Sequence, residues 1–117
     1  AMFLNLTSFL SANSIRSTNS LDGIDWCTSN NSTPCAVANL SPSLPILVMS
    51  MQGHYFIRDG EHIFETSTSL DKDFVVVAGA THGLGTCTAC EPTPGAFNNA
   101  RKNLFDYIAA WAVPPRF

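Results

Sequence analysis

The chain of 117 residues is long enough for one domain or for part of one, and 45% of its residues are hydrophobic while only 13% are charged. This balance argues against a disordered chain, and the net charge of −3 with six scattered lysines and arginines argues against nucleic-acid binding. The apolar runs fall far short of the ~20 residues that a spanning helix needs, so we expect no membrane span.

The first 44 residues contain one expected helix and a long irregular segment. Phe3, Leu6 and Leu10 recur at helical spacing, which predicts a short helix within residues 3–15. Residues 16–44 are rich in serine, asparagine, threonine and proline and show no period, so we expect no regular element there. A segment this long without structure is unusual in a compact domain unless it is cross-linked or functional.

A strand, a helix and a second strand are expected next. The continuous apolar run at residues 46–49 predicts a strand over about 45–51 that is covered on both faces. The run at residues 74–78 predicts a second buried strand over about 73–79, and a helix over about 60–70 lies between the two. Because a helical crossover joins parallel strands, we expect a βαβ unit with a parallel pair.

Two acidic residues stand at the start of this expected helix. Asp59 can cap it, and Glu61 falls in its first turn, where the helix dipole favours an acid. Ile63, Phe64 and Leu70 supply its apolar side.

The clearest helix is expected over residues 97–112, before a pair of prolines that stops it. Its apolar stripe consists of Phe97, Ala100, Leu104, Ile108 and Trp111. These elements leave both edges of a two-stranded sheet open and cannot cover both of its faces. The chain therefore looks like one end of a larger doubly wound α/β domain, completed by a parent protein or by another copy.

Ligands of an open parallel sheet bind beyond the carboxyl ends of its strands. Two loops leave such ends here, at residues 53–59 and 79–90. His82 stands three residues after the strand-ending Gly79. Imidazole exchanges protons near neutral pH, so His82 is a candidate general acid–base.

The order of these features resembles the C-terminal part of an α/β-hydrolase. From residue 45 to 111 the chain shows a strand, an acid-bearing loop, a helix, a strand, a Gly-x-x-His loop and a final helix. The segments 53–58, 9–13 and 87–90 also resemble stretches of a group of bacterial hydrolases.

The resemblance implies that residues 1–117 form a single partial domain. Residues 1–44 would hold the short helix and the cysteine-containing irregular segment, and residues 45–117 would hold the C-terminal βαβα unit of the hydrolase sheet.

By this resemblance His82 is the histidine of a Ser-His-acid triad, first the base toward the serine and then the acid toward the leaving group. The family's acid follows the first of the two strands, but His54 stands where an Asp is common. Asp59 and Glu61 are the nearest carboxylates downstream and become candidates for the catalytic acid. Helix capping is the alternative interpretation of both, and a backbone-bonded loop histidine is the alternative for His82.

The nucleophile of such a triad is missing from the sequence. Gly-x-Ser-x-Gly occurs nowhere, and the similar spacing at residues 79–83 has threonine at its centre and is followed by glycines and prolines rather than a helix. We therefore expect a truncated or cleaved hydrolase that is inactive alone and whose partner is the missing N-terminal part. Its parent would act on a small ester-like substrate, and no cofactor or metal is implied.

The four cysteines predict two disulfides. Cys27–Cys35 and Cys87–Cys90 are the first choice, because each pair is close in sequence. A crossed pairing of Cys27 with Cys87 or Cys90, a zinc site and redox thiols stay open as alternatives. Disulfides fit an exported protein, periplasmic or secreted.

A second hypothesis belongs to another class of protein. The chain could be a small non-enzymatic domain, stabilised by disulfides, that self-associates through its open sheet edges.

Overall fold

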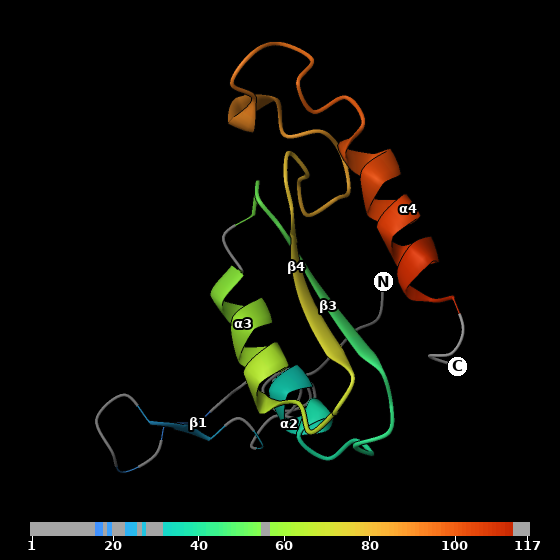
Figure 1. Ribbon diagram of the computed structural model, residues 1–117. Helices are drawn as coiled ribbons and strands as arrows, with labels where there is room; N and C mark the ends of the chain where they lie inside the picture. Colours follow the sequence, from blue (N-terminus) through green and yellow to red (C-terminus); the bar gives the residue numbers. More distant parts are fainter. Residues whose placement is uncertain are drawn as a thin grey trace, which may run out of the picture.

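The computed structural model describes residues 16–17, 19, 23–25, 27, 32–54 and 57–113. The helix expected within residues 3–15 lies outside this part of the chain. The elements in chain order are β1 (Arg16–Ser17), β2 (Ile24–Asp25), α2 (Thr33–Val37), β3 (Ile46–Met51), α3 (Ile57–Thr66), β4 (Lys72–Val77), the 3-10 turn η2 (Thr88–Cys90) and α4 (Ala100–Trp111) (Figure 1).

The fold is mixed α/β and is built on a small parallel sheet. Strands β3 and β4 pair in parallel, with a register that runs from Ile46 opposite Lys72 to Met51 opposite Val77. The predicted βαβ unit is therefore confirmed, with α3 as its crossover. Strands β1 and β2 form a separate short antiparallel pair.

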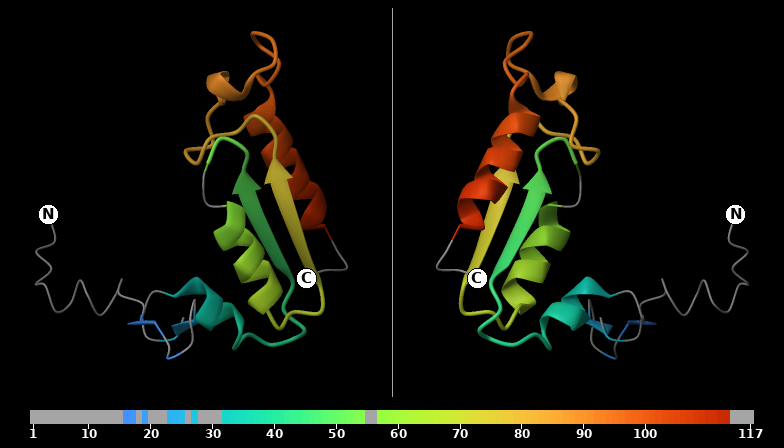
Figure 2. Two further views of the ribbon diagram at one scale, coloured as in Figure 1. Left: turned by 90° about the vertical axis from the view of Figure 1, so that its left-hand side faces the viewer. Right: turned by 90° about the vertical axis from the view of Figure 1, so that its right-hand side faces the viewer.

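Helices α3 and α4 flank the parallel sheet on opposite faces (Figure 2). Continuous apolar runs in both strands require this arrangement, because successive side chains of a strand point to opposite faces. The coverage is incomplete on the α3 side, where Val76 is 44% exposed. The expectation of a buried second strand is therefore wrong for most of β4: Phe74 and Val75 are half-buried, and only Val77 is buried.

The main core lies between the sheet and α4. Its buried residues are Val77, Ala80, Ala100 and Leu104, and Met49, Met51, Leu84, Phe97 and Ile108 pack against them. The predicted apolar stripe of the last helix therefore faces the sheet. The helix itself begins at Ala100 rather than Phe97, because residues 94–99 form turns, yet Phe97 still joins the core.

Side-chain hydrogen bonds fasten each helix to β4. The Trp111 indole N–H donates to the Asp73 carboxylate over 2.6 Å and ties the end of α4 to the start of the strand. On the other face, the Lys72 ammonium donates to the carbonyl oxygens of Phe64 and Ser67 over 2.8 and 2.7 Å. A cation at the carboxyl end of α3 offsets the helix dipole and occupies carbonyls that the helix leaves open.

The boundaries of α3 correct three expectations. The helix begins at Ile57, so Asp59 lies in its first turn rather than at the capping position, and Glu61, which was expected in the first turn, lies beyond it. The helix ends at Thr66, and Leu70 lies beyond it with 88% of its surface exposed, so Leu70 adds nothing to the apolar side. Beyond the helix, the Ser69 hydroxyl donates to Leu44 O over 2.6 Å and connects this loop to the chain before β3.

The segment 16–44 is more regular than expected. Besides the short β1–β2 pair, it contains α2, which Ser32 caps by accepting a hydrogen bond from the Cys35 backbone N–H. Proline in the first turn of α2 favours a helical start. The Cys27–Cys35 disulfide, with Cα atoms 5.1 Å apart, then fastens this short helix to the chain before it.

No helix in the described ranges is long and apolar enough to cross a membrane.

A substitution at Gly60 tests how closely α3 packs on the sheet. A Cβ at Gly60 would overlap the Ser50 hydroxyl and lie 3.0 Å from Cε2 of Phe74. Gly→Ala in an exposed helix stabilises by about 1 kcal/mol, whereas overpacking costs about 1–3 kcal/mol. We expect Gly60→Ala to lower the free energy of unfolding, measured by urea denaturation.

The double variant Ser50→Ala with Gly60→Ala is the control, because it removes the overlapping hydroxyl and should recover part of the loss. A Gly60→Ala chain that is more stable than the parent sequence would contradict the packing described here.

Candidate functional site

The loops after β3 and β4 both leave the sheet at the carboxyl ends of the strands, and they are hydrogen-bonded to each other. The Gly53 N–H donates to Ala80 O over 2.8 Å, and the Gly79 N–H donates to the side-chain oxygen of Gln52 over 2.8 Å. Parallel pairing brings the two carboxyl ends together, and these two bonds connect the loops that follow them.

His54 and His82 meet at this edge. Their ring centroids are 4.2 Å apart and the ring planes form an angle of 69°, an edge-to-face contact. His54 is half-buried and His82 is exposed. The sequence singled out His82 for chemistry and treated His54 only as a departure from a family pattern. The sequence contained a signal for both histidines. His54 comes one residue after Gly53 and His82 comes three residues after Gly79, and each glycine ends or follows a predicted strand.

Tight turns present the two imidazoles. The His54 N–H donates to Met51 O over 3.0 Å, which reverses the chain directly after β3. Around His82, the Thr81 N–H donates to Gly85 O over 2.8 Å, and Leu84 adopts a left-handed conformation with φ of 61°. The exposed His82 therefore lies in a turn that the Thr81–Gly85 hydrogen bond closes.

An open cleft of about 830 Å³ lies beside the histidine pair. It is lined by Thr33, Val48, Met49, Ser50, Met51, His54, Asp59, Gly60, Ile63, His82 and Leu84. Asp59 reaches it from the first turn of α3, which begins just after the histidine-bearing loop. One carboxylate and two imidazoles therefore border the same space.

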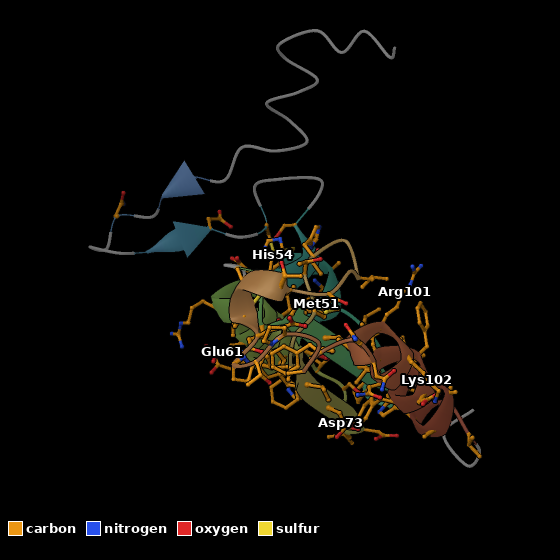
Figure 3. All side chains as sticks on the ribbon, turned by 90° about the horizontal axis from the view of Figure 1, so that it is seen from above. Met51, His54, Glu61, Asp73, Arg101 and Lys102 are labelled. Carbon is orange, nitrogen blue, oxygen red and sulfur yellow. A yellow bond between two sulfur atoms is a disulfide. The ribbon has the colours of Figure 1, made fainter. Side chains whose placement is uncertain are left out.

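Glu61, the other candidate acid, is placed differently. Its carboxylate pairs with Arg58 one turn earlier on α3, and it does not line the cleft. Figure 3 looks down on the carboxyl ends of the strands and shows His54 there with Met51, whereas Glu61 belongs to α3. Of the two carboxylates, Asp59 is thus the one that shares a cavity with His82.

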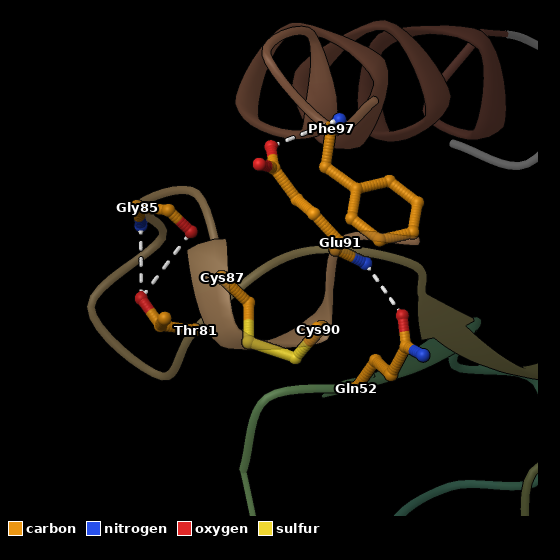
Figure 4. Close-up of a disulfide and its surroundings, with 8 residues drawn as sticks. Gln52, Thr81, Gly85, Cys87, Cys90, Glu91 and Phe97 are labelled. Carbon is orange, nitrogen blue, oxygen red and sulfur yellow. Dashed lines mark hydrogen bonds between the residues drawn. A yellow bond between two sulfur atoms is a disulfide. The ribbon is translucent and has the colours of Figure 1, made fainter. Parts of the chain in front are cut away.

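The Cys87–Cys90 disulfide closes the loop that follows His82. Its Cα atoms are 5.2 Å apart, and both first-choice cysteine pairings are confirmed, so the crossed-pair and zinc alternatives are wrong. Beyond the disulfide, the Glu91 carboxylate accepts a hydrogen bond from the backbone N–H of Phe97 (Figure 4) and another from the backbone N–H of Gly95. This contact leads the chain from the disulfide to α4.

Phe97 and Gly79 pack together where the second loop leaves β4. Gly79 has a φ of 69°, in the left-handed region that favours glycine. A Cβ there would overlap the Phe97 ring, so the glycine is required both by the turn and by the core.

The arrangement can move protons and bind an apolar group. Two imidazoles in contact can accept, donate and orient protons. Five of the eleven residues that line the cleft have aliphatic or methionine side chains, namely Val48, Met49, Met51, Ile63 and Leu84. Within the described ranges, no group of three or more His, Cys, Asp or Glu residues is arranged to hold a metal ion.

Comparison with known proteins gives no match: no family model, no curated protein and no solved structure is significantly similar to the chain.

Gln52 provides a test of how the two loops are held together. Its side-chain oxygen accepts from the Gly79 N–H, so Gln52→Leu should expose that amide. Loss of a hydrogen bond of this kind costs about 1 kcal/mol, roughly fivefold in the amide's exchange rate with deuterium. Gln52→Glu keeps an acceptor oxygen and should leave the rate near that of the unaltered chain. Equal exchange in the two variants would show that the side chain does not hold the loops.

Proposed function

We propose that the chain is the C-terminal portion of an α/β-hydrolase and that His82 is the proton-transfer residue of its active site. The observation that carries the proposal is the meeting of His82 with His54 at the carboxyl ends of two parallel strands, beside a cleft that Asp59 also lines. Ligands of open parallel sheets bind at this edge. The order strand, helix, strand, histidine loop, helix supports the same proposal.

In the proposed reaction, His82 takes the proton of a serine hydroxyl as the serine oxygen attacks the acyl carbon of an ester. The bond to the alcohol oxygen then breaks, and the alcohol leaves with the proton from His82. Water, activated by the same imidazole, attacks the acyl-enzyme, which releases the acid and restores the serine. The serine and the oxyanion-stabilising groups would be supplied by a part of the parent outside this chain.

Asp59 is the carboxylate we propose for orienting His82. It borders the cleft with the imidazole, whereas Glu61 is engaged by Arg58. His54, in contact with the His82 ring, would limit the orientations of that ring. The apolar side chains of the cleft, which include Met49, favour a substrate with an apolar acyl group.

We also propose that the parent works in an oxidising compartment, outside the cytosol. Two disulfides in a short chain support this, since such bonds persist mainly in exported proteins.

The hydrolase proposal predicts two activities. The isolated chain should show no turnover of nitrophenyl butyrate above the rate of free imidazole, because no serine nucleophile is present for His82 to activate. In the full-length parent, His82→Ala should lower kcat by at least about 10³-fold. His62→Gln, on α3 and outside the cleft, is the matched control and should leave kcat nearly unchanged.

The choice of acid is tested in the same assay. Asp59→Asn should lower kcat by about 10⁴-fold, as loss of a triad carboxylate does, while Glu61→Gln should only weaken a surface ion pair. Full activity of His82→Ala in the parent would refute the proposal, and the reverse result for the two acids would reassign the carboxylate.

A specific observation also favours the second candidate, a self-associating domain. The cleft touches four consecutive residues of β3, Val48 to Met51, whose side chains alternate between faces, so it runs along the outer edge of the strand. Among the described residues β3 pairs only with β4, and no residue of β3 is charged. An uncharged open edge of this kind pairs readily with another strand.

Self-association through this edge would protect particular amides. The Ile46 N–H donates to Asp71 O, directly before β4, and the Gln52 N–H donates to Val77 O at the end of β4. In a parallel ladder the N–H groups of Leu47, Met49 and Met51 therefore point outward. We expect their exchange with deuterium to slow as protein concentration rises, with a matching increase in sedimentation coefficient. Amides of β3 that already face β4 are the internal control. A monomer at micromolar concentration with unprotected outer amides would contradict this candidate.

A further inference from the structure

The Cys87–Cys90 disulfide lies against the loop of His54 as well as within the loop that follows His82. A Cβ placed on Gly53 would be 2.8 Å from Cys87 Sγ and 2.9 Å from Cys87 Cβ, closer than real Cβ atoms come. Cys87 is only 7% exposed. The sulfur therefore lies directly on the backbone of the residue before His54, and only a residue without a side chain leaves room for it.

The same cysteine is bonded to the loop that carries His82. The Cys87 N–H donates to Gly79 O over 2.7 Å, and Ala80 pairs with Thr86 across a narrow bridge. These contacts close the base of the turn that holds His82. Cys87 thus contacts the base of each of the two turns that present the imidazoles.

We infer that Cys87, bonded to Cys90, is a positioning residue that keeps the His54 and His82 rings in contact. A free cysteine side chain can occupy three staggered rotamers, whereas the bond to Cys90 selects the one that places Sγ against Gly53. The two histidines come from separate loops, so their contact depends on what fixes one loop relative to the other. The consequence for catalysis rests on the proposed function, but the ring contact itself does not.

The contact can be measured in the isolated chain by NMR. With labelled histidines, the chain should show a nuclear Overhauser cross-peak between ring protons of His54 and His82. The variant Cys87→Ser with Cys90→Ser should lose this cross-peak. The matched control, Cys27→Ser with Cys35→Ser, removes the other disulfide at α2 and should retain it. A cross-peak that survives removal of the Cys87–Cys90 bond overturns the inference.

If the serine variant does not fold, two alanine variants still test whether the contact of Cys87 with Gly53 keeps the histidine rings together. Gly53→Ala leaves both disulfides in place and adds one methyl group where Cys87 Sγ lies. Gly83→Ala adds the same group next to His82, where no atom lies within 4 Å. We expect loss of the cross-peak in the first and retention in the second. Retention in both overturns the inference.

Activity of the parent separates this inference from the proposed function. If both hold, removal of the Cys87–Cys90 bond should lower kcat by about 10²-fold with KM unchanged, the cost of a misplaced catalytic group. A parent without hydrolase activity would refute the proposed function, while loss of the ring contact in the serine variant would still support the positioning role.

Discussion

The parallel pairing of β3 with β4 is the constraint from which the arrangement of the site follows. Parallel strands end at the same edge of their sheet, so the loops that follow them must lie side by side. The crossover helix has to begin at that edge too, because it returns the chain to the start of β4. This is why an acidic residue in the first turn of α3 borders the same cleft as two histidines that lie 28 residues apart in the sequence.

The rest of the molecule stabilises that edge with few apolar residues. In the part of the chain that the structure describes, the buried residues of the main core are Val77, Ala80, Ala100 and Leu104, and three of these have small side chains or lie at the end of an element. Small cores of this kind are usually supplemented by covalent links. The two disulfides have different local roles: one fastens α2 to the chain before it, and the other lies where the two histidine-bearing loops meet.

Both candidate functions would use the outer edge of β3, which is unpaired among the described residues. A cleft that follows this edge could receive a strand from the remainder of a hydrolase or from a second copy, and in either case the added strand would end or begin near the histidine pair. An added parallel strand would also end at the carboxyl end of the sheet, where His54 and His82 lie. Completion of the sheet and completion of the site would then be one event.

The elements of the second half could be predicted because their causes are local. The apolar runs of β3 and β4, the stripe of α4 and the closeness of the paired cysteines each depend on neighbours in the sequence, and each prediction agreed with the structure to within a few residues. The irregular segment was predicted less well. The short α2 depends on one capping serine, one proline and a disulfide. A helix of five residues is too short to show a periodic pattern of apolar residues in the sequence.

The site could be predicted only in part, for a physical reason. The sequence alone indicated that His82 follows a strand at the ligand-binding edge, since that depends on the order of elements. It did not indicate that the His54 ring lies against His82, that Asp59 rather than Glu61 borders the cleft, or that Cys87 lies on Gly53. Those facts depend on the separation of two strands, the rotation of a helix and the packing of one loop on another. Such distances are set by tertiary contacts between residues remote in the chain, so only the folded structure decides them.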